Sequence, residues 1–280
     1  MSSNDIVRIG MVNFINTAAL YEVWKESVHN PAWQVVEAAP ADLNRMLAND
    51  ELDLGLVSSH EYAEHPEKYQ ILPDLSISAT GAVGSVFLFS RRMPERLDGA
   101  RVCLSAQSKT SNGLIKIILE DFYGVCPIYY QGESDLALDD FQAVLAIGDQ
   151  ALRLKYDGGF PYVLDLGDVW RRKTKLPFVF AVWAISEKFV ARRTPCLLAI
   201  HQELKRCVYE GRRRLDEISK RVAPRIPMAS QDCLRYLQGI ELDLCPDKLD
   251  GLKVFYENLI RRGEALPQAL PIKIWSAAEE

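Results

Sequence analysis

The sequence predicts an α/β fold built as two lobes, and three features of its pattern carry this prediction. Short apolar runs alternate with amphipathic helical patterns up to residue 185. Such alternation is typical of βαβ units, whose strands form mostly parallel sheets flanked by helices. The alternation breaks at residues 91–94 and starts again at residue 97. From residue 187 to residue 262 the pattern is helical almost throughout, so we expect a helical carboxyl-terminal region.

The first run of elements alternates strands with helices. Short apolar segments predict strands at 6–10, 33–38, 52–57, 72–78 and 85–90. Helical spacing of apolar residues after polar loops predicts helices at 18–26, 40–47 and 60–65. Because the ligand sites of such sheets lie beyond the carboxyl ends of the strands, the polar loops after these strands are candidate site segments.

The second run repeats the same order of elements. Strands are predicted at 100–104, 126–130, 143–147 and 178–185, and helices at 134–141 and from residue 148. A further helix is marked by apolar residues at i, i+3, i+4 and i+8, namely Leu114, Ile117, Ile118 and Phe122. We assign its N-cap to Thr110 or Ser111, and the free N–H groups of its first turn favour an anion.

The two runs suggest one discontinuous lobe and one inserted lobe. We assign residues 1–89 and 181–280 to lobe I and residues 90–180 to lobe II. The apolar segments 85–90 and 178–185 are then expected to be the two crossings between the lobes, which would act as a hinge. A cleft between two lobes is a usual place for a small ligand.

Composition limits the classes of function. The net charge of −5 over 280 residues argues against nucleic acid and against an anionic membrane surface as partners. The six cysteines and four histidines show no metal-binding spacing, so we expect neither a metal site nor a disulfide framework. No apolar run is long enough to span a membrane, and no export signal precedes the first predicted strand, so we expect a cytoplasmic protein.

The loops that would face the cleft carry mainly neutral hydrogen-bond donors, which suit a small anion such as a carboxylate. They are Asn13, Asn16, Thr17, Ser58, Ser59, Gly84, Ser85, Ser105, Ser108, Thr110, Ser111 and Asp149. The nucleophile motif G-x-S-x-G, the dinucleotide motif G-x-G-x-x-G and the P-loop are all absent from the sequence. The residues alone therefore predict an anionic ligand and specify no reaction.

Several longer segments add a family resemblance. The chain resembles the chorismate dehydratases of the futalosine route to menaquinone, which are cytoplasmic proteins similar in fold to type II periplasmic binding proteins. The resembling segments are 13–17, 53–62, 72–78, 84–86, 108–111, 146–152 and 165–181. The chain departs from the family at Ala18 and Ala19, where a proline is frequent, and at Lys175, where glycine is common.

The resemblance implies an activity and a set of site residues. Chorismate would lose water to give 3-[(1-carboxyvinyl)oxy]benzoate, without a metal or an organic cofactor. Asn16 and Ser85 would be the catalytic residues, with Asn16 orienting the departing hydroxyl. Substrate-binding residues would be Thr17, Ser58, Ser59, Val86, Ser108, Thr110, Ser111 and Asp149. A carboxylate of the substrate itself could then act as the base.

Two other functions remain open. One is the 1,4-dihydroxy-6-naphthoate synthase of the same pathway, which carries an Ile-His-Glu motif with a candidate histidine base. This chain has Ile147-Gly148-Asp149 around that position, which favours the dehydratase. The other is a non-catalytic protein that binds or senses a small anion. The carboxyl-terminal helices offer faces for a homodimer, which is also an expectation.

Overall fold

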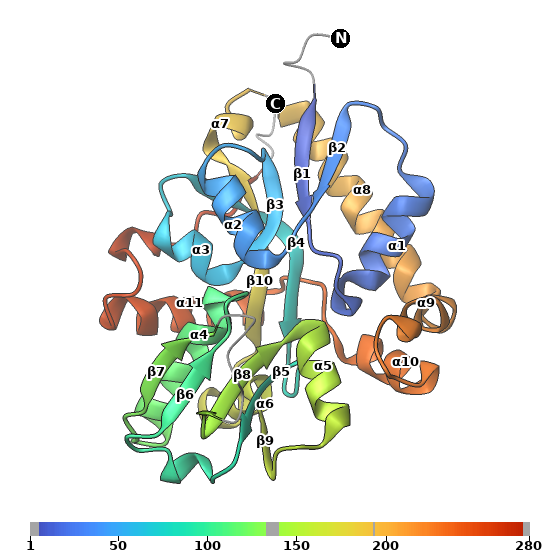
Figure 1. Cartoon of the computed structure of the whole chain (residues 1–280). Helices are drawn as coiled ribbons and strands as arrows, with labels where there is room; N and C mark the ends of the chain where they lie inside the picture. Colours follow the sequence, from blue (N-terminus) through green and yellow to red (C-terminus); the bar gives the residue numbers. More distant parts are fainter. Residues whose placement is uncertain (1–5, 133–139, 193, 277–280) are drawn as a thin grey trace.

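The structure, a computed structural model, describes residues 6–132, 140–192 and 194–276. Two five-stranded sheets lie one above the other, with helices around both (Figure 1). The upper sheet has the strand order β2 (Trp33–Glu37), β1 (Val7–Met11), β3 (Leu54–Ser58), β10 (Phe178–Ser186) and β4 (Tyr69–Ala79). The lower sheet has the order β7 (Ile128–Gln131), β6 (Arg101–Leu104), β8 (Ala143–Ile147), β5 (Val86–Ser90) and β9 (Tyr162–Asp165).

In each sheet one strand runs against the other four. In the upper sheet β1 pairs in parallel with β2 and β3, whereas β10 is antiparallel to both β3 and β4. In the lower sheet β6 pairs in parallel with β7 and β8, whereas β5 is antiparallel to β8 and β9. The predicted α/β architecture is therefore confirmed, and four of the five strands in each sheet run in one direction, although half of the neighbouring pairs are antiparallel. The reversed strand is, in each sheet, the strand that follows a change of sheet along the chain.

The chain changes sheets earlier than the predicted lobe boundaries. β4 ends at Ala79 in the upper sheet and β5 begins at Val86 in the lower one, so the segment 85–90 does not belong with lobe I. The return lies between β9 and β10, and β10 belongs to the upper sheet from residue 178. We had interpreted both apolar segments as crossings. Each is instead buried because it pairs with a neighbour on both sides inside a sheet.

Helices cover both sheets. In the upper half, α1 (Ala18–Ser27) packs along α8 (Thr194–Arg213) and α9 (Leu215–Val222), and α2 (Pro40–Ala48) packs on β3. In the lower half, α4 (Lys109–Lys116) and α5 (Gly148–Asp157) pack on β8, and α6 (Leu166–Thr174) packs on β5. The predicted helix at 134–141 falls largely on residues outside the described ranges. No helix in those ranges is long and apolar enough to cross a membrane.

Two carboxyl-terminal helices, α10 (Ser230–Gly239) and α11 (Pro246–Arg261), lie beside the junction of the two halves (Figure 1). Together with α7 (Glu187–Val190), α8 and α9 they confirm the predicted helical region. After α11, Arg262 pairs with Glu120 of the lower half at 2.6 Å, while α11 itself packs on β10 of the upper half. This region therefore contacts both halves at once.

An aromatic cluster packs around the segment between α6 and β10, where the chain returns from the lower sheet to the upper sheet. The rings of Trp170 on α6 and Phe178 on β10 lie 5.1 Å apart, and Phe255 of α11 lies 4.9 Å from Phe178. All three side chains are fully buried, and the Trp170 indole N–H donates to the carbonyl of Pro177 at 3.1 Å. Burial of such large rings holds the connection between the halves close to α11.

Candidate functional site

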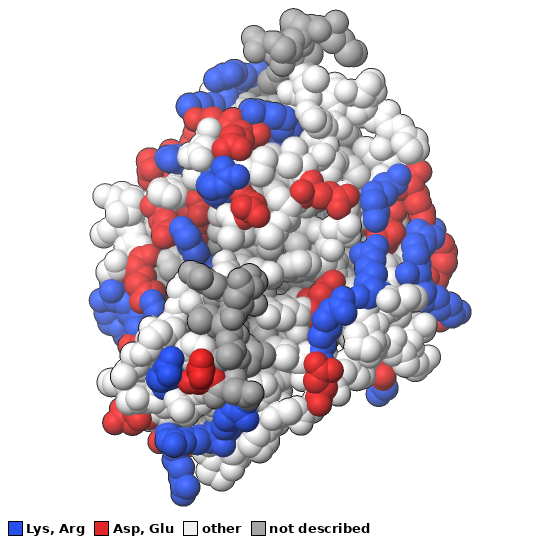
Figure 2. Space-filling model, in the orientation of Figure 1, with Lys and Arg blue, Asp and Glu red and all other residues white. Residues whose placement is uncertain are grey.

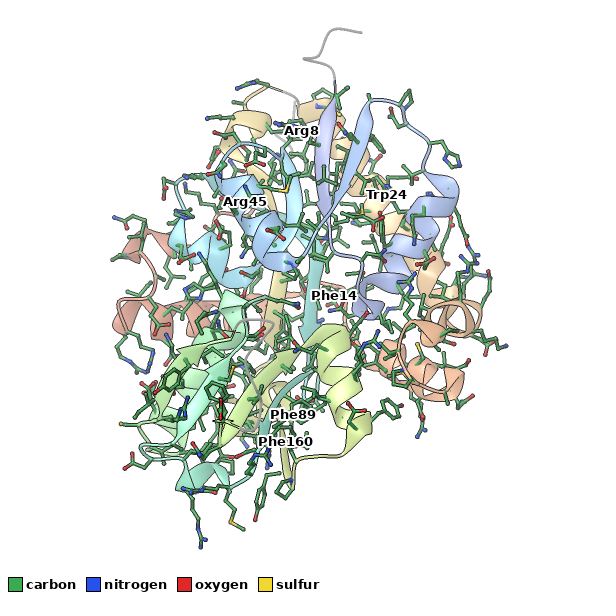
Figure 3. The ribbon with its side chains drawn as sticks, viewed as in Figure 1. Arg8, Phe14, Trp24, Arg45, Phe89 and Phe160 are labelled. Carbon is green, nitrogen blue, oxygen red and sulfur yellow. The ribbon has the colours of Figure 1, made fainter. Side chains whose placement is uncertain are left out.

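A cavity of about 60 Å³ lies where the loops of the upper sheet meet those of the lower sheet. Phe14, on the loop after β1, lies at this level between the halves (Figure 3). The lining residues are mainly apolar, and none of those described has a side chain that titrates. They are Val12, Phe14, Asn16, Thr17, Pro40, Leu56, Val57, Ser58, Ile77, Val83, Ser85, Val86, Ser108, Ser111, Ile147, Gly148, Phe180 and Ala181.

Seven of the ten predicted site residues line this cavity. They are Asn16, Thr17, Ser58, Ser85, Val86, Ser108 and Ser111. Four of the lining segments lie at or just after the carboxyl ends of β1, β3, β6 and β8, and the others come from the start of β5, from β4, from β10 and from the start of α2. Such strand ends gather at one edge of a sheet, which is why loops distant in sequence meet here.

Asn16 brings an unpaired acceptor to the cavity. It lies in the short 3-10 turn η2 (Ile15–Thr17), and its Oδ1 atom is buried without a hydrogen-bond partner. The turn is held from both sides, because Thr17 Oγ1 donates to the Val12 carbonyl at 2.7 Å and the Ile15 N–H donates to Asp149 at 3.1 Å. A buried acceptor without a partner costs free energy, which a donor on a bound ligand would recover.

Ser85 is buried at the start of β5, and its surroundings fix its position. The Asp165 carboxylate accepts the backbone N–H groups of Val83 at 3.1 Å and Gly84 at 2.7 Å. The hydroxyl of Tyr236, on α10, donates to Ser85 Oγ at 2.8 Å. Sequence analysis missed both Asp165 and Tyr236 as site neighbours, because nothing local to α10 or β9 marks them.

Ser58 is held by the buried residue Asn44. The Asn44 amide nitrogen donates to Ser58 Oγ at 2.8 Å, and Asn44 Oδ1 accepts the Ser58 N–H at 3.1 Å. Since Ser58 Oγ accepts from Asn44, its own hydrogen is free to donate into the cavity. Sequence analysis saw Asn44 only as part of a predicted helix.

The N-cap of α4 is Ser108, which corrects the prediction of Thr110 or Ser111. Ser108 Oγ accepts the Ser111 N–H at 3.2 Å, and the Ser108 hydroxyl donates to Ser111 Oγ at 3.1 Å. The N-cap lies two or three residues earlier than predicted, because the Ser108 side chain reaches the N–H three residues on. The Ser111 hydroxyl hydrogen is thereby left for the cavity.

Ser59, Thr110 and Asp149, also predicted as binding residues, are outside the lining and bond across the junction instead. Ser59 Oγ lies 3.2 Å from Thr110 Oγ1 and donates to the Val179 carbonyl at 2.9 Å. Thr110 Oγ1 also accepts the His60 N–H at 3.0 Å. The two contacts of Thr110 join α3 (Ser59–Glu64) of the upper half to α4 of the lower half.

Two partly buried carboxyl groups, Asp149 and Asp165, contact the segments that line the cavity but do not line it themselves. Burial raises the pKa of Asp149, although the Ile15 N–H and the positive charge of Arg225 oppose the rise. Burial likewise raises the pKa of Asp165 against the hydrogen bonds from Gly84 and Val83. These carboxylates act on the site by holding backbone, since neither lines the cavity.

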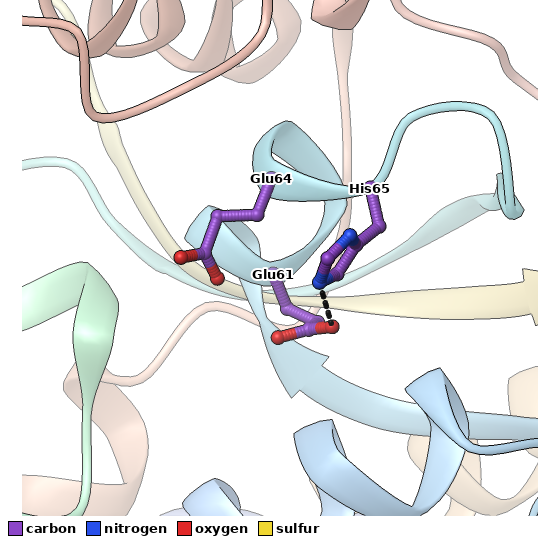
Figure 4. Close-up of side chains that lie close together, drawn as sticks. All are labelled: Glu61, Glu64 and His65. Atoms are coloured by element: carbon purple, nitrogen blue, oxygen red, sulfur yellow. Dashed lines mark ion pairs between the residues drawn. The ribbon is translucent and has the colours of Figure 1, made fainter.

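One acidic cluster near the site resembles a metal site by composition. Glu61, Glu64 and His65 lie together on and just after α3, with His65 Nε2 3.8 Å from Glu61 (Figure 4). The ammonium of Lys109, from α4, lies 2.5 Å from Glu64 and 3.8 Å from Glu61. Because this lysine already supplies the positive charge, we assign the cluster to an ion-pair network that joins α3 to α4.

Surface charge also fits a small ligand. On the face shown in Figure 2, Lys and Arg side chains lie among Asp and Glu side chains. Many charged side chains among the described residues form ion pairs within the chain, such as Arg214 with Glu26 at 2.7 Å and Lys188 with Asp50 at 2.6 Å. A nucleic-acid surface would gather positive charge on one face, so the prediction of a small anionic ligand is retained.

Sequence comparison finds a matching family model and similar proteins in two organisms. A family model described as menaquinone biosynthesis matches residues 7–260. A chorismate dehydratase of Thermus thermophilus is 35% identical over 268 residues, which cover 90% of this chain and 94% of that protein. A chorismate dehydratase of Campylobacter jejuni is 28% identical over 183 residues, which cover 64% of this chain and 67% of that protein.

Comparison with solved structures identifies the fold. A protein of Archaeoglobus fulgidus superposes with a TM-score of 0.74 at 19% identity, covering 93% of this chain and 99% of that one. The periplasmic aliphatic sulphonate binding protein of Escherichia coli gives 0.68 at 12% identity, covering 99% and 94%. At these identities the likeness concerns the fold alone, and it confirms the predicted periplasmic-binding-protein-like architecture.

Proposed function

The chain belongs to the menaquinone-biosynthesis family, and on that premise we propose that it is a chorismate dehydratase. It is then a carbon–oxygen lyase that converts chorismate to 3-[(1-carboxyvinyl)oxy]benzoate and water. The observation that carries the proposal is the cavity itself. Serine hydroxyls and one unpaired amide oxygen face it, and no described lining residue titrates.

This donor set suits the chemistry of the substrate. Chorismate carries two carboxylates, a ring hydroxyl and a ring that becomes aromatic when water is lost. The C–O bond to the hydroxyl breaks, a neighbouring ring carbon loses its proton, and that C–H electron pair completes the aromatic ring. Because aromatisation supplies the driving force, the protein's part is to orient the substrate and to stabilise the departing oxygen.

We assign the departing hydroxyl to Asn16 and Ser85. Asn16 Oδ1 accepts the hydrogen of the substrate hydroxyl, which gives that buried oxygen its missing partner. Ser85 donates a hydrogen bond to the departing oxygen and keeps its proton. Since no described lining residue can take the ring proton, a carboxylate of the substrate serves as the base, and the proton leaves with the hydroxyl as water.

We assign the substrate carboxylates to the serine hydroxyls and to the first turn of α4. Ser58 and Ser111 each accept a hydrogen bond from a protein neighbour and are thereby set to donate to an anion. The backbone N–H groups in the first turn of α4 add further donors. Thr17 and Val86 shape the wall, while Ser59, Thr110 Oγ1 and Asp149 hold the two halves together.

The geometry at Gly148 favours the dehydratase over the naphthoate synthase. Gly148 lines the cavity with φ +56°, and a Cβ there would lie 2.9 Å from the Phe14 ring. A histidine base at this position would therefore meet both backbone strain and a steric clash. Asp149, the next residue, is engaged by the Ile15 N–H and is outside the lining.

Substrate access needs the contacts across the junction to open. We propose that the halves hinge at residues 80–85 and 175–177, which connect the two sheets. We also propose a cytoplasmic location, supported by six cysteines that are all free thiols, as a reducing compartment would keep them. The homodimer stays a prediction.

Incubation of the purified protein with chorismate tests the proposed function. We expect stoichiometric formation of the aromatic ether and loss of chorismate, followed by ultraviolet absorbance and mass spectrometry. Addition of a chelator should leave the rate unchanged, because the reaction as proposed needs no metal. Tight binding of chorismate without turnover would instead support a binding or sensing protein.

A further inference from the structure

We propose that Tyr236 is a positioning residue that acts through Ser85. Its hydroxyl donates to Ser85 Oγ and so directs the Ser85 hydrogen toward the departing oxygen of the substrate. The inference deepens the proposed function and rests on it. Tyr236 stands 151 residues after Ser85 in the chain, on a helix that sequence analysis associated with no site.

The position of Tyr236 is set by packing. Its helix, α10, buries Cys233 and Leu237, and this presents Tyr236 to the loop before β5. The ring packs against Gly84, where an added Cβ would come within 3.2 Å of the tyrosine ring. Gly84 has φ +75°, so the loop needs a glycine both for its backbone and for the close approach of the ring.

The direction of the Ser85 hydrogen follows from a count of donors and acceptors. A serine hydroxyl has one hydrogen and two lone pairs. Tyr236 occupies one lone pair at 2.8 Å, and within the described ranges no protein acceptor takes the Ser85 hydrogen. Because Ser85 also lines the cavity, that hydrogen is available to a bound ligand.

Two further features hold the hydrogen bond from Tyr236 to Ser85 in place. The Asp165 carboxylate holds Val83 and Gly84, so Ser85 cannot shift away with its loop. Burial raises the pKa of Tyr236, with Asp149 and Asp165 adding to the effect, so the phenol remains a protonated donor at neutral pH. The Ser85 bond to Tyr236 opposes this rise without reversing it.

Tyr236→Phe tests the proposal, because it removes the donor and keeps the ring. We expect kcat for chorismate to fall about 3- to 10-fold, as for loss of one neutral hydrogen bond, with KM within about twofold of wild type. In a Ser85→Ala background the same change should cause no further loss in kcat, since the residue acts only through Ser85. Tyr156→Phe is the matched control: that hydroxyl bonds Asp232 at 3.2 Å, and kcat should not change.

An unchanged kcat in Tyr236→Phe, or an equal loss with and without Ser85, would overturn the role of Tyr236 while leaving the dehydratase in place. A wild-type protein without turnover would overturn the proposed function first. Should Tyr236→Phe not fold, Tyr236→Gln and Tyr236→Met give the same comparison. The glutamine retains a donor and should have the higher kcat, and equal rates would contradict the proposal.

Discussion

The Asp149 carboxylate of α5 accepts the backbone N–H of Ile15 at 3.1 Å, one residue before Asn16. This bond crosses from the lower half of the molecule to the upper half. It holds the turn that presents the unpaired Asn16 oxygen to the cavity. Asp149 itself is outside the cavity lining, so in our proposal it positions Asn16, and Asn16 contacts the substrate.

Two replacements of Asp149 should distinguish a role in holding the Asn16 turn from a direct contact with the substrate. Asp149→Leu removes the acceptor, and we expect kcat to fall about tenfold because the Asn16 turn loses its anchor. Asp149→Asn keeps an Oδ1 acceptor and should retain most of the wild-type rate. Equal loss in both variants, measured by steady-state turnover of chorismate, would show that the charge matters and not the bond.

The burial of Asp149 beside the Ile15 N–H predicts that the stability of the fold depends on pH. The folded-state pKa of Asp149 is raised above its ordinary value of 3.8, because burial disfavours the carboxylate. The folded state therefore holds this proton more tightly than the unfolded chain, and its contribution to stability is lost as pH rises from about 3.8 through the folded-state pKa.

Urea unfolding of wild type and Asp149→Asn over that pH range checks the sign. The free energy of unfolding of the variant, relative to wild type, should increase as pH rises through the window and then level off. A relative free energy that stays flat would mean that Asp149 titrates alike in both states.

Gly148 provides a third prediction. Gly148→Ala should lower the free energy of unfolding by more than the cost of a left-handed backbone alone, about 1–2 kcal/mol, since the new methyl group meets Phe14. It should also lower turnover, because Phe14 lines the cavity. Gly158→Ala is the control: its φ is +68°, and the nearest atom to an added Cβ is 4.0 Å away. Similar losses in the two variants would argue against the contact with Phe14.

The adjacent serines 58 and 59 should differ in effect. Ser58→Ala removes a donor to a substrate carboxylate, and we expect KM for chorismate to rise about 10- to 100-fold, as for loss of a hydrogen bond to a charged group. Ser59→Ala breaks bonds to Thr110 and Val179 outside the cavity, so it should lower the melting temperature and leave KM near wild type. A larger change of KM in Ser59→Ala would restore its predicted role in binding.

Much of the fold and the loops that line the cavity could be predicted from the sequence, whereas the residues that hold those loops in place could not. Alternating elements indicated parallel strands, and the loops after them, with Asn16, Ser58 and Ser111, do meet at one cavity. The residues behind these loops escaped prediction, because Asn44 and Tyr236 are ordinary helix residues until the chain folds. Apolar character alone could not tell a crossing segment from a central strand, which explains the shifted boundaries at β5 and β10.

Turnover of chorismate by wild type and by Asn16→Ala, in one assay, tests the account most directly. The wild-type protein should form 3-[(1-carboxyvinyl)oxy]benzoate, and Asn16→Ala should lose about 100-fold or more in kcat while it still binds chorismate. Near-wild-type turnover by Asn16→Ala, or no product from the wild-type protein, would contradict it.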